Sequence, residues 1–241
     1  MTQKTSLGVV VPCFNEEHNV DYFESEVGQF LPYLRENFPH IEVQFYVVEN
    51  NSTDGTRVKL NSLMSRQKNL SIVDCSAQGY GAALKFGFET AKKNDYVSFL
   101  DFDNTYPMKS IPDLLTELQK KELDLVYGAR LHQQSEIDPI RKAGNRLYVI
   151  LLKCFIGSEL SDVCSGMRVF KSKHVDSILT LKADDLSFSI QLTSYAILKK
   201  WKIGELPISY RKRIGESKLS LLKDGVLFLL VAMKAGLLRK V

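Results

Sequence analysis

The chain has 241 residues, enough for one large α/β domain or for one domain with a small appendage. Its 44% of hydrophobic and 25% of charged residues are ordinary for a globular protein and exclude a disordered chain. The net charge is +4, but residues 199–241 carry eleven Lys and Arg against three acids, and this basic end favours an anionic partner: a phosphate-bearing ligand, a membrane surface or nucleic acid.

Apolar runs and helical repeats alternate through the first half of the chain. Short apolar runs predict strands at 7–12, 41–49, 70–74, 96–100 and 123–127. Helices are predicted between them, at 16–34, 56–64, 78–93 and 111–118. Asn15 is expected to cap the first helix, and Pro32 to kink it or end it early. This alternation predicts an α/β fold with a mostly parallel central sheet, right-handed crossovers and helices on both faces.

The pattern changes beyond Arg130. Loops are expected at 132–139 and 211–218, the second of them basic, and helices at 141–155 and 186–200. A loop leading into a strand is predicted at 162–170, and a further strand at 203–210. Residues 219–238 are apolar nearly all round a predicted helix, with Lys and Arg at its flanks.

Polar side chains follow three of the predicted strands at their carboxyl ends. They are Asn15 with Glu16, Glu49 with Asn50 and Asp54, and Asp101 with Asp103. In an open α/β sheet, residues from separate strand ends converge on one crevice. This convergence favours a nucleotide or sugar-nucleotide pocket over a hydrolytic triad.

The aspartates Asp101 and Asp103 are the candidate metal ligands. Two carboxylates one residue apart repel each other unless a cation lies between them or one is protonated. Hard oxygen ligands suit Mg²⁺ or Mn²⁺, and these ions in turn suit phosphates. An isolated D-x-D is also typical of a solvated turn.

The glycines of Gln78-Gly-Tyr-Gly81 precede and open a predicted helix. Gly79 would allow close approach of a phosphate, although the spacing matches neither the dinucleotide fingerprint nor a P-loop. Packing of the helix against the sheet accounts for these glycines equally well.

Neither zinc nor a membrane-spanning helix is expected. The four cysteines show no C-x-x-C spacing and no histidine partner pattern. No apolar run reaches the roughly 18 residues that a bilayer-spanning helix needs. No secretory signal peptide is recognised at the N-terminus, so a reduced, cytosolic compartment is expected.

With these motifs the chain resembles the family 2 glycosyltransferases, and within them the dolichol- and polyprenyl-phosphate mannose (sugar) synthases. The matching stretches run in order through nearly the whole chain: V-V-V-P-C-F-N-E-E (9–17), V-V-E-N-N-S-T-D-G-T (47–56), Q-G-Y-G-A-A-L (78–84), L-D-F-D (100–103), V-Y-G-A-R (126–130), S-D-V-C-S-G-M-R-V-F (161–170), I-G-E-L-P-I (203–208) and G-E-S-K-L (215–219). Each motif alone is weak, whereas their order is specific.

The resemblance implies a Rossmann-like GT-A fold over residues 1–218, followed by the C-terminal apolar helix 219–241. It implies a nucleotide-diphosphate sugar donor (GDP-mannose or a UDP-sugar), Mg²⁺ or Mn²⁺, and an inverting displacement at the anomeric carbon. At the nucleotide it places Pro12, Asn15, Glu16, Glu49, Asn50, Gly79 and Asp101. As catalytic residues it indicates Asp103, Arg130, Asp162 and Arg168, of which the two arginines would face a phosphate of the donor or acceptor. At the acceptor phosphate it places Arg211, Arg213, Ser217 and Lys218, and at the metal Asp101 and Asp103.

The chain departs from the family pattern in three places. The family usually has two acids where this chain has Glu49 and Asn50, and many relatives carry a glutamate at the position of Gln191. Fuller members add transmembrane helices after this point, and no such run follows here.

Three functions stay open. The leading one is transfer of a sugar to a dolichyl or undecaprenyl phosphate, which is already an anion and needs no base. The second is transfer to a hydroxyl of a glycan or lipid, which would need a base such as Asp162, Asp184 or Asp185. The third is a catalytically silent nucleotide-binding or scaffold protein, which the Asn50 and Gln191 departures keep open.

The C-terminal helix has three roles to choose from: docking on the core, an oligomer interface (a homo-oligomer), or attachment to a membrane surface. A long-chain acceptor resides in a bilayer, so attachment is favoured. The expected location is therefore peripheral, on the cytoplasmic face of a membrane. Nucleic acid is not among the partners that the resemblance implies.

Overall fold

Residues 4–130 and 135–212, together with Leu230 and Met233, are described by the computed structural model. In this part of the chain the strands form one seven-stranded sheet in the order β3-β2-β1-β4-β6-β5-β7. The strands are β1 (Thr5–Cys13), β2 (Ile41–Glu49), β3 (Leu70–Asp74), β4 (Tyr96–Phe99), β5 (Leu125–Ala129), β6 (Arg168–Lys171) and β7 (Ile203–Pro207). Strand β6 runs antiparallel to β4 and β5, and every other pairing is parallel. The predicted mostly parallel sheet is confirmed.

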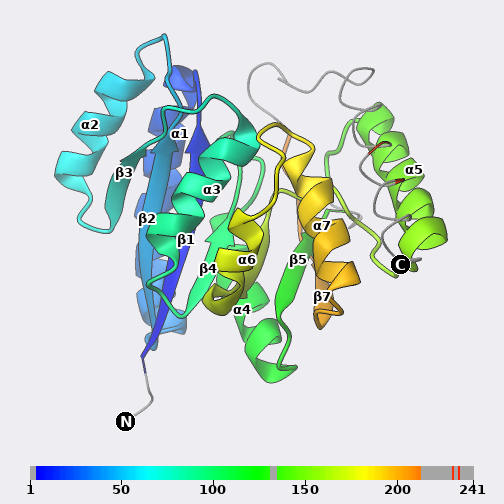
Figure 1. Cartoon of the computed structure of the whole chain (residues 1–241). Helices are drawn as coiled ribbons and strands as arrows, with labels where there is room; N and C mark the ends of the chain where they lie inside the picture. The colour runs from blue at the N-terminus through cyan, green and yellow to red at the C-terminus, as the bar shows by residue number, and fades with distance from the viewer. Residues whose placement is uncertain (1–3, 131–134, 213–229, 231–232, 234–241) are drawn as a thin grey trace.

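Helices cover both faces of this sheet. They are α1 (Val20–Asn37), α2 (Thr56–Arg66), α3 (Tyr80–Ala91), α4 (Ile111–Lys120), α5 (Pro139–Ile156), α6 (Val175–Leu179) and α7 (Phe188–Leu198), with short 3₁₀ turns at Glu17–Asn19, Met108–Ser110 and Ser172–His174. Figure 1 shows α3, α6 and α7 in front of the sheet and α1 behind it. Each face has its own apolar core, and alternate residues of one strand supply them: Val9 and Val11 belong to the core under α1, and Val10 to the core under α3. Burial on both faces explains the unbroken apolar run of β1.

Two local expectations about the first helix, a cap at Asn15 and an early end at Pro32, were wrong. Asn15 does not cap it, because Asn15 has φ 51° and its Oδ1 accepts a hydrogen bond from the Thr53 amide at 2.8 Å. The helix instead starts with a 3₁₀ turn at Glu17–Asn19. Pro32 does not end it either, since α1 continues to Asn37.

The C-terminal part of the sequence predictions is largely outside the described residues. This holds for the domain boundary at 218 and for the helix at 219–241, of which only Leu230 and Met233 are described, both helical and exposed. Among the described helices, none is both long and apolar enough to cross a membrane.

Two helical glycines should respond oppositely to alanine. A Cβ at Gly87 of α3 would lie 2.2 Å from Val10 Cγ1, whereas one at Gly28 of α1 would meet nothing within 4 Å. We expect Gly87→Ala to lower the free energy of unfolding by about 1–3 kcal/mol through overpacking. Gly28→Ala should raise it by about 0.5–1 kcal/mol, because alanine is the better helix former. Urea unfolding of both variants measures this, and equal effects would contradict the close helix–sheet contact.

Candidate active site

The three polar clusters lie at one end of the sheet, where the carboxyl ends of β2, β1 and β4 lie side by side. Strand β1 is hydrogen-bonded between β2 and β4, with Cys13 opposite Glu49 and the Leu100 amide 3.2 Å from the Val10 carbonyl oxygen. With strands about 4.8 Å apart, the ends of β2 and β4 are separated by about 10 Å. An asparagine with positive φ follows each of these strands: Asn15 (51°), Asn51 (60°) and Asn104 (58°). Asparagine tolerates this left-handed conformation, which turns the chain sharply at each strand end.

Hydrogen bonds join the loops that follow β1 and β2. The Asn15 amide donates to Ser52 Oγ at 3.0 Å, and the Glu16 amide donates to Thr56 Oγ1 at 2.8 Å. Asp54 accepts from the Thr56 amide at 3.0 Å and so starts α2. Pro12 is half-buried within β1 and pairs with Val48. The residues expected at the nucleotide are therefore brought together from two loops.

Glu49 ends β2 with a buried carboxylate. Its oxygens accept from the Ser52 amide at 2.6 Å and the Asn51 amide at 3.2 Å. Arg57 Nη1 lies 3.9 Å away. This carboxylate is thus held in one orientation at the strand end.

The side chain of Asn50 is hydrogen-bonded to the loop that leads into α3. Its side-chain amide donates to the carbonyl oxygens of Ala77 (2.6 Å) and Cys75 (3.3 Å), and its Oδ1 accepts from the Gly79 amide at 2.9 Å. A carboxylate has no hydrogen to donate to those carbonyls. The departure from the family's second acid therefore has a structural consequence here.

We expect Asn50→Asp to lower the free energy of unfolding by about 2–3 kcal/mol. The substitution would place a buried carboxylate against two carbonyl oxygens, of which that of Ala77 would keep only the Cys75 thiol as a donor, at 3.2 Å. Asn51→Asp is the matched control, since Asn51 is exposed and its side chain donates one hydrogen bond, to the Ser76 carbonyl oxygen at 2.9 Å. Chemical denaturation of the two variants measures this difference. Equal free energies of unfolding would show that the hydrogen bonds of the Asn50 side chain do not stabilise the fold.

Gly79 and Gly81 pack against the segment that precedes α7. Gly79 has φ 132°, and a Cβ on it would lie 2.1 Å from the Asp184 carbonyl oxygen; a Cβ on Gly81 would lie 2.6 Å from that of Ala183. Gln191 of α7 secures the same segment, because its Oε1 accepts from the Ala183 amide at 2.9 Å. These contacts give the two glycines a packing role, although against the segment before α7 and not against the sheet as expected.

Asp101 and Asp103 follow β4 in different surroundings. Asp101 is half-buried, and its Oδ1 accepts from the Tyr80 hydroxyl at 2.9 Å. Burial, together with the charge of Asp101, raises the pKa of Tyr80 well above its usual value, so this hydroxyl stays a donor. Asp103 is only 2% exposed, and its Oδ1 accepts from the Thr105 hydroxyl at 2.6 Å and the Thr105 amide at 3.2 Å.

This donor set fits a cation that is bound together with a diphosphate. The described residues contain no group of three or more His, Cys, Asp or Glu side chains that could hold a metal ion by themselves. Mg²⁺ in phosphate sites typically uses one or two carboxylates and completes its shell with substrate phosphates and water. Asp101 and Asp103 match that requirement, and Tyr80 fixes one of them.

Arg130 and Asp162 form a buried ion pair beside this loop. Arg130 Nε and Nη2 lie 2.8 and 2.9 Å from the two carboxylate oxygens, and the Arg130 amide also donates to Asp162 at 2.9 Å. Complete burial of Asp162 opposes its ionisation, but the charge and hydrogen bonds of Arg130 outweigh burial and hold the pKa of Asp162 below its usual value. Arg130 also lies over the ring of Tyr210, at 5.4 Å.

Arg168 does not face a phosphate, and this expectation needs correction. Its side chain is fully buried at the start of β6. The guanidinium donates to the carbonyl oxygens of Ser165, Ser189 and Val163 at 3.0, 3.1 and 3.3 Å, and it stacks over the ring of Tyr127 at 4.4 Å. Arg168 therefore braces the loop 163–165 from within the core.

Of the residues expected at the acceptor phosphate, only Arg211 is described. It donates to Glu26 at 2.9 Å and to Asn104 Oδ1 at 2.8 Å, and its amide bonds the Thr105 carbonyl oxygen at 2.9 Å. These contacts hold it beside the loop of Asp101 and Asp103. Arg213, Ser217 and Lys218 lie outside the described residues.

Several supporting residues were missed from the sequence. Tyr80 lies in the Q-G-Y-G stretch, but only its glycines attracted notice. Glu205 accepts from the amides of Ser161 and Asp162 at 2.8 and 2.9 Å, although I-G-E-L-P-I marked its position. Gly166 lets the backbone approach Asp101, since a Cβ there would lie 2.7 Å from its Oδ2. Motif spacing does not reveal which partner each of these residues meets.

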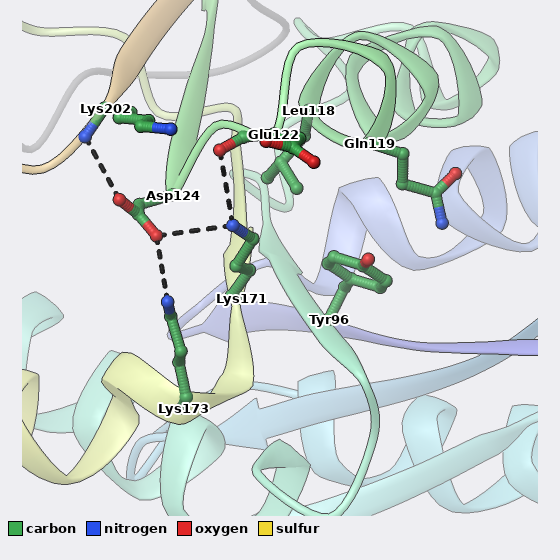
Figure 2. A pocket seen from close by; sticks show the side chains of 8 residues that line it. All are labelled: Tyr96, Leu118, Gln119, Glu122, Asp124, Lys171, Lys173 and Lys202. Carbon is green, nitrogen blue, oxygen red and sulfur yellow. Dashed lines mark hydrogen bonds and ion pairs between the residues drawn. The ribbon is translucent and has the colours of Figure 1, made fainter.

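A pocket of about 420 Å³ lies elsewhere, at the amino ends of β4 and β5. Figure 2 shows three lysines around Asp124 there: the side chains of Lys171 and Lys173 approach its carboxylate at 3.4 and 3.2 Å, and the Lys202 backbone amide at 3.1 Å. The carboxylate already balances part of this positive charge. The pocket and the candidate active site therefore lie at opposite ends of these strands.

The family model "Glycosyl transferase family 2" matches residues 8–179. A low-salt glycan biosynthesis hexosyltransferase of Haloferax volcanii is 29% identical over 94% of this chain and 53% of its own length. A dolichyl-phosphate hexose transferase of the same organism is 27% identical over 91% of this chain and 90% of its own. A dodecaprenyl-phosphate galacturonate synthase of Rhizobium johnstonii is 25% identical over 88% of this chain and 60% of its own.

The chain thus spans about half the length of the first of these relatives, and nearly all of the second. Among solved structures, glucosyl-3-phosphoglycerate synthase from Mycobacterium tuberculosis, in complex with Mn²⁺, UDP-glucose and phosphoglyceric acid, matches with a TM-score of 0.73 at 18% identity. The match covers 96% of this chain and 80% of that structure. At this identity the match establishes the fold, which agrees with the expected GT-A architecture.

Proposed function

The chain belongs to glycosyltransferase family 2, and from that premise we propose that it transfers a hexose from a nucleotide-diphosphate sugar to a polyprenyl phosphate, giving a lipid-linked monosaccharide. The dolichyl-phosphate hexose transferase that is matched over 90% of its length supports this acceptor class. The dodecaprenyl-phosphate galacturonate synthase supports it as well.

The state of Asp162 is the observation that carries the proposal. A hydroxyl acceptor has a pKa far above 7 and needs a carboxylate to take its proton, whereas a phosphate acceptor is already an anion. Asp162 is fully buried, paired with Arg130, and has a lowered pKa, which makes it a poor base. The other two candidates are also engaged: Asp184 with Lys85 at 2.6 Å, and Asp185 with the Ser187 amide at 2.8 Å.

We assign the remaining roles by position along the sheet edge. Pro12, Asn15, Glu16 and Glu49 would contact the base and ribose. Asp101 and Asp103 would hold Mg²⁺ or Mn²⁺, which when bound stabilises the charge of the departing diphosphate. The acceptor phosphate oxygen forms the new bond to the anomeric carbon as the bond to the nucleotide diphosphate breaks, with inversion. Arg211, with Arg213, Ser217 and Lys218, would neutralise and orient the incoming phosphate.

We propose that the reaction takes place at a membrane surface. A transferase domain at 1–218 and an apolar, cation-flanked helix at 219–241 would act at the cytoplasmic face of a membrane, where a polyprenyl phosphate resides. The helix would attach the protein peripherally.

A transfer assay tests the proposed function. The full chain is incubated with Mn²⁺, a polyprenyl phosphate in detergent, and labelled GDP- or UDP-hexoses in turn. We expect lipid-extractable label with one donor, and an inverted anomeric centre in the product by NMR. Nucleotide binding without any turnover would support a silent nucleotide-binding protein, and transfer to a glycan or lipid hydroxyl would support the alternative transferase.

A further inference from the structure

The outer side of α5 carries a stripe of exposed apolar side chains. Ile140, Leu147 and Ile150 are 61%, 54% and 58% exposed. Their spacing of seven and three residues places them on one face of the helix. Phe155 and Cys154 extend the exposed surface toward the C-terminal end.

Within α5 the charged residues beside this stripe are all positive, and the nearest acid in sequence is Asp138, which caps the helix. Helix α5 contains Arg141, Lys142, Arg146 and Lys153, and no Asp or Glu between Pro139 and Ile156. A second copy of this face would bring like charges together, which opposes a symmetric dimer through it. A surface with negative charge and apolar depth complements both properties, and an anionic bilayer has both.

The inner side of α5 is attached to the candidate active site. Leu152 and Ile156 are buried in the core. Asn145 is also buried; its Oδ1 accepts from the Cys164 amide at 3.2 Å, and its Nδ2 donates to the Ser161 carbonyl oxygen at 3.4 Å. These two contacts flank Asp162, the partner of Arg130. The position of α5 is therefore coupled to the loop that holds this ion pair.

We propose that the outer face of α5 lies on the surface of an anionic bilayer and thereby holds the active site beside its lipid-borne acceptor. The choice of acceptor rests on the proposed function, whereas contact with the bilayer does not. The side chains of Ile140, Leu147 and Ile150 enter the acyl boundary, and the flanking lysines and arginines contact lipid phosphates.

A fluorescent probe on Cys154 reports directly whether α5 contacts the bilayer. Cys13 and Cys75 are buried, and burial raises the pKa of Cys164 to about 12, so a maleimide dye should react with Cys154 selectively. We expect a blue shift on adding vesicles that contain phosphatidylglycerol, and a much smaller one with phosphatidylcholine alone. The matched control carries Cys154→Ser and Val58→Cys, because Val58 is 73% exposed on α2. Its probe should not shift.

Two charge substitutions test the same face without a probe. Leu147→Glu with Ile150→Glu should weaken vesicle binding at least about tenfold, whereas Val58→Glu should leave it unchanged. The double variant should still transfer sugar to a short, water-soluble polyprenyl phosphate, so a failed binding test and a failed proposed function give different results. An unshifted Cys154 probe would overturn the proposal, as would a shift that depends on protein concentration without vesicles, which indicates self-association.

Discussion

Replacing Asp101 with Asn is expected to lower kcat/KM roughly 100-fold or more while barely changing the free energy of unfolding. Asn Oδ1 can still accept the hydrogen bond that the Tyr80 hydroxyl donates to Asp101 at 2.9 Å, so the loop keeps its shape. What the variant loses is the negative charge that would hold a divalent cation. Steady-state kinetics over a Mn²⁺ titration, with urea unfolding alongside, separates these two effects.

Two further substitutions make this result interpretable. Asp176→Asn removes an exposed acid at the start of α6, outside the aspartate loop, and should leave turnover unchanged. Asp103→Ala should abolish turnover, but it should also cost about 1–3 kcal/mol of stability, because the Thr105 amide and hydroxyl lose their acceptor. Full activity and an unaltered Mn²⁺ dependence in Asp101→Asn would eliminate the metal assignment.

Replacing Arg130 with Met is expected to cost about 3–5 kcal/mol of stability at pH 7, since it leaves the Asp162 carboxylate buried without its cation. The double variant Arg130→Met with Asp162→Leu should recover much of this loss, because an apolar pair needs no desolvation of charge. Urea unfolding of the two single variants and the double variant gives the coupling energy. An additive cycle would show that the pair is not coupled.

The pH dependence of this loss has a definite sign. The folded-state pKa of Asp162 is lowered from 3.8, so the pair contributes its full stability above about pH 4. That contribution is lost as the pH falls through the folded-state pKa. The stability gap between wild type and Arg130→Met should therefore shrink as the pH falls below about 4, as measured by denaturation in matched buffers. A gap that stays constant over this range would contradict the lowered pKa.

The sheet, and the strand ends that hold the candidate site, could be predicted from the sequence. Residues 41–49 and 70–74 were predicted with their observed bounds, because apolar runs that end abruptly in polar residues define buried strands well. That Asn15, Glu49 and Asp101 lie on one edge follows from the parallel order of β2, β1 and β4. Helix α6 was missed, since five residues are too few for a helical repeat to stand out.

Side-chain partners could not be predicted in the same way. Arg168 was expected at a phosphate because of its motif, but the antiparallel β6 places it inside the core, where backbone carbonyls satisfy it. The departures at Asn50 and Gln191 likewise depend on contacts far apart in sequence. Asn50 donates to the loop before α3, and Gln191 accepts from Ala183, which a glutamate could also do. We therefore expect neither departure to remove a group that the proposed reaction requires.

In the proposed reaction the acceptor is an anion that reacts without a base. Wild-type transfer rates to a polyprenyl phosphate and to the free polyprenol of the same chain length, with the same donor and Mn²⁺, decide this. We expect product from the phosphate and none above background from the alcohol. Equal or faster transfer to the polyprenol would contradict it, and would require a base that Asp162, in its ion pair with Arg130, does not provide.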